Sequence, residues 1–165
     1  MLHKVVQLGG KSYFWLEKTN VVSMIQEYQV SGFRVREYEE LESTNTEAER
    51  VGWSELEDKM VILTYRQTQG RGQVGNHWES EPGKNISMTV VFKPRELSAG
   101  QQFAVSMVIA LGACDFISRY VSGCSVKWPN DIYVGDRKIS GILIEHSIMG
   151  RYVGGSLCGI GVNIN

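Results

Sequence analysis

Beyond residue 124 the chain consists of short apolar or alternating stretches separated by turn signals, and this pattern restricts the fold most. The stretches have the length and composition of β-strands: they cover residues 125–128, 131–134, 138–146 and 152–165. Gly135-Asp136 and Met149-Gly150 fit the tight turns of β-hairpins. Because a two-residue connection can join only antiparallel strands, we predict an antiparallel sheet for this part of the chain.

The preceding residues add further strands and a few helices. We expect strands at 12–16, 33–40, 61–66 and 86–92, and helices near 21–28, from 44 to about 58, and over 101–121. Thr44 and Glu47 fit a capping box at the start of the second helix. The third helix has an apolar stripe, predicted to face the core, made of Phe103, Met107, Ala110, Leu111, Cys114, Ile117 and Val121. The sequence therefore predicts an α+β fold, with a mixed, largely antiparallel sheet packed by a few helices.

The size and charge of the chain exclude several classes of protein. Its 165 residues suffice for one ordinary domain, and 17 Lys and Arg against 18 Asp and Glu argue against extensive nucleic-acid binding. No uninterrupted apolar run approaches the roughly 18 residues that cross a bilayer, and the first residues lack the apolar core of a signal peptide. Three cysteines without a C-x-x-C pair indicate neither a disulfide framework nor a zinc site. We therefore expect a cytoplasmic protein with no membrane partner.

A long loop over residues 67–85 is rich in glycine. Gly70, Gly72 and Gly75 can expose backbone N–H groups toward an anion. Arg71 adds a charged fork suited to a carboxylate or a phosphate. The loop is neither a Walker loop, since no Gly-Lys-Ser/Thr follows, nor a dinucleotide fingerprint, since no helix opens after it. Glycine spacing alone is also typical of a flexible surface loop, so both interpretations stay open.

A second group of polar residues lies around a Trp-Pro sequence. Pro129 ends the preceding strand, so Asn130 and Asp131 project from a turn. Asp131 is suited to hold a magnesium ion through phosphate oxygens. Lys138 begins the next strand, and Gly141 allows close approach to its backbone. Each feature also has a plain structural interpretation, as turn chemistry or as a solvated charge.

Five segments occur in an order and spacing that a known family shares. They are Ser43-Thr44-Asn45, Gly70-Arg71-Gly72 through Trp78, Lys127-Trp128-Pro129-Asn130-Asp131, Lys138 with Gly141-Ile142-Leu143, and Gly159 to Asn163. Together they resemble the catalytic domain of biotin protein ligases, also called biotin–[carboxylase] ligases or holocarboxylase synthetases. One such motif is weak evidence, but five in order are specific. The resemblance covers about residues 36–165 and implies a class II synthetase-like biotin/lipoate ligase fold.

The resemblance implies an ATP-dependent ligation in two steps. The carboxylate of biotin attacks the α-phosphate of ATP, giving biotinyl-5′-adenylate and pyrophosphate, and a lysine of a biotin carboxyl carrier protein then displaces AMP. By matching position, Lys138 and Arg71 would be catalytic. The biotin site would comprise Ser43, Thr44, Asn45, Gln67, Gly70, Arg71, Gly72, Gln73, Lys138, Gly141 and Gly159. The ATP site would comprise Arg71, Trp78, Lys127, Asn130, Asp131 and Asn163, with Asp131 serving Mg²⁺ through the phosphates.

The chain departs from the family pattern in three places. Gln73, Val74, Asn76 and His77 stand where better-known relatives are more basic, so we expect weaker retention of the adenylate. His77, which lacks partners at ligand spacing, is interpreted as an ordinary polar residue. Residues 1–35 are an N-terminal extension of unclear role without a helix-turn-helix, so we expect no DNA binding. The catalytic domain at 36–165 ends early and is expected to be truncated.

Other functions remain as alternatives. A lipoate or octanoate ligase would share the fold, but the usual glycine run followed by His is not visible. A truncated ligase could hold biotin without transferring it, and a plain interaction domain would do neither. The oligomeric state is open, since an edge strand near the C-terminus could pair two subunits into a homodimer.

Overall fold

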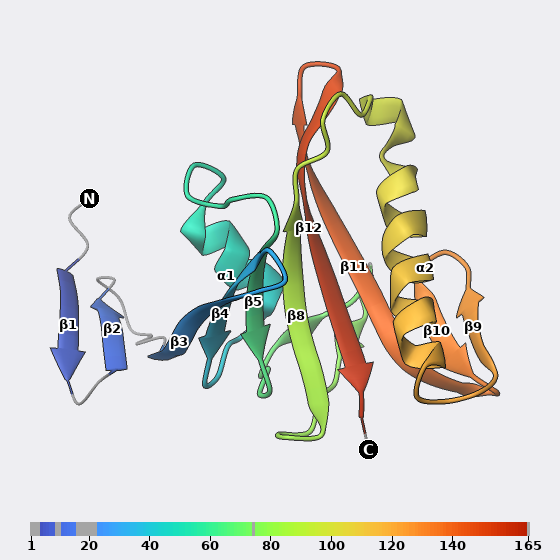
Figure 1. Cartoon of the computed structure of the whole chain (residues 1–165), viewed down its shortest axis with the longest axis horizontal. Helices are drawn as coiled ribbons and strands as arrows, with labels where there is room; N and C mark the ends of the chain where they lie inside the picture. Colours follow the sequence, from blue (N-terminus) through green and yellow to red (C-terminus); the bar gives the residue numbers. More distant parts are fainter. Residues whose placement is uncertain (1–3, 9–10, 16–22, 74, 165) are drawn as a thin grey trace.

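The computed structural model describes residues 4–8, 11–15, 23–73 and 75–164, which form one large sheet and two α-helices (Figure 1). The sheet contains β1 (Lys4–Leu8), β2 (Lys11–Trp15), β3 (Ser23–Val30), β4 (Phe33–Tyr38), β5 (Met60–Thr64), β8 (Asn85–Phe92), β9 (Cys124–Lys127), β10 (Asp131–Val134), β11 (Arg137–Met149) and β12 (Tyr152–Asn163). The helices are α1 (Thr44–Val51) and α2 (Phe103–Ser118), the latter after a short 3₁₀ turn at Ala99–Gln101. Two further short strands, β6 (Gly70–Arg71) and β7 (His77–Trp78), pair with each other.

The strand order confirms the predicted fold class. Neighbours run β1-β2-β3-β4-β5-β8-β12-β11-β10-β9, and every adjacent pair is antiparallel except β4 with β5. Both predicted hairpin turns are present, with Gly135 and Gly150 at positive φ. The expected C-terminal edge strand was wrong, because β12 lies inside the sheet between β8 and β11. The edges of the described sheet are β1 and β9.

The helix predicted over residues 21–28 was also wrong. Residues 21 and 22 lie outside the described residues, and Ser23–Val30 forms strand β3. This strand pairs with β4 through a two-residue turn in which Ser31 and Gly32 both have positive φ, 49° and 81°. Positive φ at both positions belongs to the turn that matches the twist of a β-hairpin. The Ser-Gly pair was therefore the signal that the helical interpretation overlooked.

Helix α1 is shorter than predicted, and it begins differently. It ends at Gly52, whose φ of 83° suits glycine, and Ser43 at its N-cap makes no side-chain capping bond, so the capping box does not form. Instead, the Thr44 backbone N–H donates to the Gln67 side-chain oxygen over 2.9 Å. A residue 23 positions away thus satisfies the helix start and ties it to the loop that follows β5.

The two helices lie on opposite faces of the sheet, and β12 separates their cores. Leu157 faces the α1 side, where it packs with Ala48, Ile62 and Val91. Ile160, an odd number of residues later and so on the other face, packs on the α2 side. Positions of β12 that share a face with Leu157, such as Gly159 and Gly161, are therefore directed toward α1 and the loop that contains β6 and β7.

The buried face of α2 differs from the predicted stripe. Ala110 and Ile117 are buried, and Cys114 packs with them, but Phe103, Met107 and Leu111 are exposed, Leu111 by 64%. The helix is apolar nearly all round, so its periodicity could not select a face. Among the described residues this one helix, taken from Ala99, is long and apolar enough to cross a membrane by length and composition alone. Core helices of soluble proteins can have the same composition.

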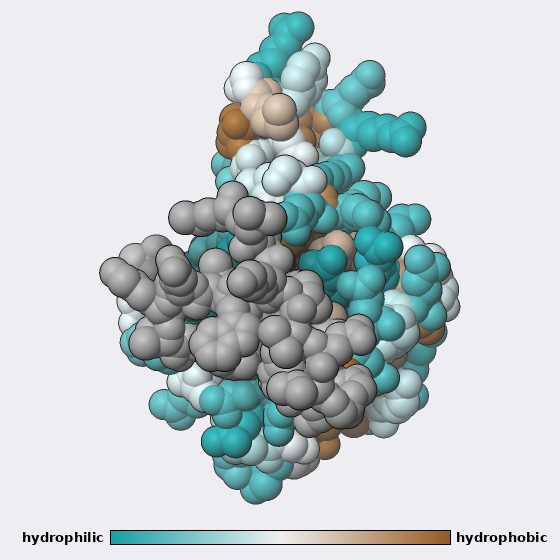
Figure 2. All heavy atoms as spheres, turned by 90° about the vertical axis from the view of Figure 1, so that its left-hand side faces the viewer, coloured by the Kyte–Doolittle hydropathy of each residue, from teal (hydrophilic) through white to brown (hydrophobic). Residues whose placement is uncertain are grey.

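The surface on the side of β1–β4 is mostly hydrophilic where it is described (Figure 2). Hydrophobic residues gather at the end that projects at the top of the view, where the β11–β12 hairpin lies. Ile148 and Met149 are exposed there.

Glu47 carries a buried carboxylate on α1, and its substitution tests how this helix packs. Burial raises its pKa, opposed by Arg50 and Arg36. Its Oε2 lies 3.7 Å from Arg50 Nη1 and accepts no hydrogen bond from the described residues. A raised pKa stabilises the fold at low pH, and that contribution is lost as the pH rises through the folded-state pKa. We therefore expect Glu47→Gln to stabilise the protein by about 1 kcal/mol at pH 7.5 and less at pH 5. Urea unfolding of both proteins at the two pH values measures this, and a larger gain at pH 5 would contradict it.

Candidate functional site

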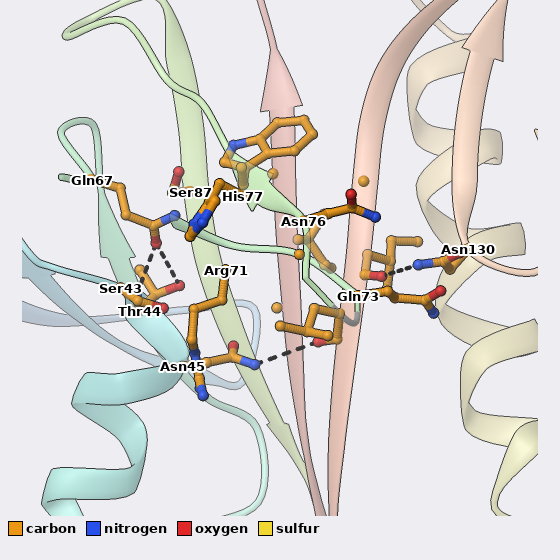
Figure 3. Close-up of a pocket in the computed structure, with 18 of the residues that line it drawn as sticks. Ser43, Thr44, Asn45, Gln67, Arg71, Gln73, Asn76, His77, Ser87 and Asn130 are labelled. Atoms are coloured by element: carbon orange, nitrogen blue, oxygen red, sulfur yellow. Dashed lines mark hydrogen bonds between the residues drawn. The ribbon is translucent and has the colours of Figure 1, made fainter. Parts of the chain in front are cut away.

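A cavity of about 290 Å³ opens on the α1 face of the sheet (Figure 3). It lies between the start of α1, the loop containing β6 and β7, and the central strands β8, β12 and β11. Of the residues predicted for biotin and ATP, it brings together Ser43, Thr44, Asn45, Gln67, Arg71, Gly72, Gln73, Trp78, Asn130, Asp131, Lys138, Gly141 and Gly159. Segments that are far apart in sequence thus form one site.

Neutral polar side chains gather at one end of the cavity. Figure 3 shows Ser43, Thr44 and Gln67 together there, with Asn130 at the opposite end. Below them, the buried Thr89 hydroxyl lies 2.8 Å from the Thr44 hydroxyl and 2.5 Å from the Asn45 side-chain oxygen. This end therefore offers uncharged donors and acceptors held by a buried network, which suits a neutral polar ligand group.

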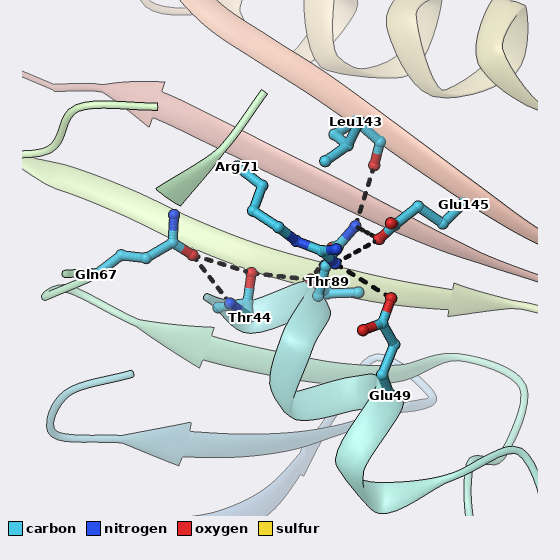
Figure 4. Close-up of polar contacts among 8 residues, drawn as sticks. Thr44, Glu49, Gln67, Arg71, Thr89, Leu143 and Glu145 are labelled. Atoms are coloured by element: carbon cyan, nitrogen blue, oxygen red, sulfur yellow. Dashed lines mark hydrogen bonds and ion pairs between the residues drawn. The ribbon is translucent and has the colours of Figure 1, made fainter. Parts of the chain in front are cut away.

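Arg71 is held by two carboxylates (Figure 4). Its Nη2 donates to Glu145 over 2.7 Å and to Glu49 over 3.2 Å. Glu145 also accepts from Asn45 Nδ2 over 2.7 Å, which links the arginine to the start of α1. The buried Arg71 Nε has no hydrogen-bond partner among the described residues. A buried donor without a partner is uncommon, and this one belongs to a residue that lines the cavity.

The second cation of the cavity lies toward its other end. Lys138 Nζ pairs with Asp131 over 2.8 Å, and it lies 5.8 Å from the centre of the Trp78 ring. Asn130 fixes the neighbouring turn to β11, since its side chain donates to the Ile142 carbonyl and its own carbonyl accepts from the Ile142 N–H. The turn and the lysine strand are thus held together as one rigid unit.

Glycines make room for the Trp78 ring. A Cβ added to Gly161 would lie 2.3 Å from Trp78 Cε2, and one added to Gly141 would lie 2.9 Å from Cζ3. Likewise, a Cβ on Gly159 would lie 2.5 Å from the Asn45 side-chain oxygen. Non-bonded carbon atoms do not approach so closely, so glycine is required at these positions for the ring and the amide to lie where they do.

Gly161→Ala is expected to displace Trp78 and to lower the free energy of unfolding by about 1–3 kcal/mol. Gly112 in α2 provides the matched control, because a Cβ there meets nothing within 4 Å. Gly112→Ala should instead stabilise the helix by about 0.5–1 kcal/mol. Urea unfolding followed by tryptophan fluorescence compares the two, and equal effects would contradict the packing described here.

Three predicted site residues lie outside this cavity. Gly70 pairs with Trp78 in the small ribbon, and a Cβ there would collide with the Trp78 carbonyl, so it shapes the loop. Lys127 extends away, its Nζ 3.5 Å from the Tyr133 hydroxyl. Asn163 lines a second cavity of about 870 Å³, which shares Lys138 with the first. The roles predicted for all three stay predictions.

Several residues of the site were not predicted. Asn76 and His77 line the cavity, although the sequence analysis treated His77 as an ordinary polar residue, and Val74 lies outside the described residues. Ser87 lines it from β8, while Glu145 acts through Arg71. Ser87 and Glu145 lie among other polar residues of their strands, and the sequence does not tell which of these face the cavity, so only the sheet register could have shown them.

Among the described residues that line the cavity, one carboxylate, that of Asp131, is available to a magnesium ion. Among the described residues no group of three or more His, Cys, Asp or Glu side chains is placed to hold a metal ion. Asp131 is close to the cavity, but its Oδ1 pairs with Lys138. Magnesium commonly uses one or two carboxylates and completes its shell with phosphate oxygens and water. The site therefore fits Mg²⁺ only as an ion carried mainly by a nucleotide.

Comparison with known proteins identifies relatives of this chain. Residues 38–163 match the model of the biotin/lipoate A/B protein ligase family. The chain is 33% identical over 125 residues to a biotin–[acetyl-CoA-carboxylase] ligase of Paracoccus denitrificans, an alignment that covers 74% of this chain and 51% of that protein. The chain spans about half the length, or less, of the curated relatives it matches first.

Comparison with solved structures finds the same kind of protein as comparison of sequences. The biotin acetyl coenzyme A carboxylase synthetase of Helicobacter pylori with bound biotinylated ATP superposes with a TM-score of 0.64 at 29% identity, over 78% of this chain and 60% of that one. The biotin protein ligase of Aquifex aeolicus in complex with biotin and ATP also gives a TM-score of 0.64, at 27% identity, over 79% of this chain and 52% of that one. The fold is therefore that of biotin protein ligase catalytic domains.

Proposed function

The chain belongs to the biotin/lipoate A/B protein ligase family, and from this we propose that it activates biotin with ATP and transfers it to a lysine of a carrier protein. The observation that carries the proposal is the single cavity that joins neutral polar groups, two cations and the Asn130–Asp131 turn. The structural relatives bound to biotin and ATP support the same pairing of substrates.

The polar end of the cavity favours biotin over lipoate or octanoate. The ureido ring of biotin has two N–H donors and one carbonyl acceptor, and Ser43, Thr44 and Gln67 offer matching groups. An alkyl chain or a dithiolane ring would leave those groups unpaired, which costs about 1–3 kcal/mol for each buried group. This cost is the physical reason for expecting discrimination among acids.

The cations act on the reacting anions. We propose that the biotin carboxylate replaces Glu145 and Glu49 as the partner of Arg71, while Lys138 leaves Asp131 for an oxygen of the α-phosphate. Both cations would then face the pentacovalent phosphorus, whose oxygens gain negative charge in the transition state. Mg²⁺, held by Asp131 and the phosphates, would neutralise further charge on the pyrophosphate that leaves.

The second step transfers the acyl group. The amine of the acceptor lysine attacks the carbonyl carbon of biotinyl-adenylate, an amide bond forms, and AMP leaves with the oxygen that bound phosphorus. We propose a biotin carboxyl carrier protein as the acceptor, on the strength of the family resemblance. A cytoplasmic location, the lack of DNA binding and a homodimer stay predictions.

The proposal is tested by pyrophosphate release from ATP and Mg²⁺ with biotin, lipoate or octanoate, since this half-reaction needs no acceptor. We expect release with biotin at least about 100-fold faster than with the other acids. Faster release with lipoate or octanoate would mean that one of these acids, and not biotin, is the substrate. Silence with all three acids, while calorimetry still detects biotin binding, would favour a binding module that does not catalyse.

A further inference from the structure

Two thiols on the α2 face of the sheet are almost in contact. Cys114 Sγ, on the last turns of α2, lies 3.2 Å from Cys124 Sγ, at the start of β9. Both pack against the same apolar cluster as Ile117 and Ile132, so their positions are set by the core of that face. The geometry brings together two cysteines from different elements, in contrast to the buried Cys158, which has no such neighbour among the described residues.

Solvent reaches the pair but not the third cysteine. Cys114 and Cys124 are each partly exposed, whereas Cys158 is fully buried in β12, where burial raises its thiol pKa to about 12. Burial and the neighbouring thiol also raise the pKa of Cys114, so its reactive thiolate is scarce at neutral pH and increases as the pH rises. The pair is therefore accessible to oxidants, and its reaction with them should be faster at higher pH.

The strand that carries Cys124 continues directly into the catalytic cavity. β9 ends at Lys127, and the following turn places Asn130 and Asp131 at the cavity wall. On its other side this turn is held to β11, by Asn130 with Ile142 and by Asp131 with Lys138. The turn is therefore only a few residues away from the contact between β9 and α2.

We propose that Cys114 and Cys124 form a reversible disulfide that fastens β9 to α2 and restrains the turn carrying Asn130 and Asp131. A low-molecular-weight disulfide, such as oxidised glutathione, serves as the oxidant. One cysteine thiolate attacks it and releases a glutathione thiolate, and the second cysteine then attacks the mixed disulfide and releases the other. Two protein thiols are oxidised to one disulfide, and one glutathione disulfide is reduced to two thiols. The separation of the sulfur atoms must fall by about 1 Å, since an S–S bond is about 2.05 Å long.

The bond itself is tested by mass spectrometry and thiol counting on the purified chain incubated with oxidised glutathione. We expect the intact mass to fall by two hydrogen atoms, the thiol count in denaturant to fall from three to one, and a reductant to reverse both. Cys114→Ser and Cys124→Ser should each prevent the change, and Cys158→Ala should permit it. A stable glutathione adduct, a cross-linked dimer or an unchanged thiol count would overturn the proposal.

The link to the cavity is tested by hydrogen exchange, which does not depend on catalysis. We expect amide exchange in the peptide covering residues 124–131 to slow by about tenfold or more on oxidation, and not in Cys114→Ser treated in the same way. Unchanged exchange in a protein that has formed the disulfide would overturn the restraint on the turn. Because neither readout uses biotin or ATP, failure of the proposed function would leave both tests intact.

Discussion

Lys138→Ala is expected to lower biotin-dependent pyrophosphate formation by about 100- to 1,000-fold. The ammonium group lies at the cavity wall between Asp131 and the Trp78 ring. In the proposed mechanism, charge builds up on phosphate oxygens at this place during adenylation. Removal of one preorganised donor to such charge typically has an effect of this size. Steady-state rates at saturating biotin and ATP measure it, because the loss should be mainly in kcat.

The control for this variant is Lys84→Ala. Lys84 is exposed, pairs with Glu81 in an i,i+3 contact, and does not line the cavity. The Lys84→Ala substitution removes the same charge from the chain, and the rate of this variant should stay within about twofold of the rate of the parent protein. A Lys138→Ala protein that is folded and retains more than a tenth of the parent rate would contradict the assignment.

Arg71→Ala is expected to lower kcat/KM for biotin by about 100-fold or more and to weaken biotin binding measured by calorimetry. The loss in binding follows from the charge-assisted, two-pronged contact that a guanidinium makes with a carboxylate. Arg71→Lys should recover only a small part, because an ammonium group lacks the planar fork. Arg119→Ala is the matched control, since Arg119 lies at the end of α2 in an exposed pair with Asp115.

Substitution of Glu145 tests whether Arg71 must change partners when biotin binds. In the structure its carboxylate holds Arg71 and Asn45 at once. If biotin replaces Glu145, then Glu145→Gln should release the arginine and alter biotin affinity by less than the loss in Arg71→Ala. An equal loss in the two variants would mean that Glu145 itself is needed to position the arginine during the reaction.

Most strands were predictable because turn chemistry is local. Gly135 and Gly150 marked the late hairpins, and the apolar stretches between them had strand length. The errors have two causes. The start of α1 depends on the distant Gln67, which no pattern near Thr44 reveals. Strand β3 was missed although the turn that pairs it with β4, Ser31-Gly32, is adjacent to it in sequence.

Much of the cavity followed from the order of the sequence segments, but its charge pairing did not. Arg71 and Lys138 were predicted as catalytic residues without any carboxylate partner being foreseen, and the structure pairs them with Glu145, Glu49 and Asp131. Glu145 lies 74 residues from Arg71, and the contact depends on the register of β11. Only the three-dimensional arrangement could show these ion pairs, on which the proposed exchange of partners rests.

The central claim is that the biotin carboxylate attacks the α-phosphate within this cavity, and oxygen transfer tests it most directly. The protein is incubated with ATP, Mg²⁺ and biotin that carries ¹⁸O in both carboxylate oxygens, and hydroxylamine traps the acyl group as biotin hydroxamate. The account predicts that the released AMP contains one ¹⁸O atom, because the oxygen that attacked phosphorus stays with it when the amine displaces AMP. Unlabelled AMP formed together with biotin hydroxamate, or no AMP at all, would contradict it.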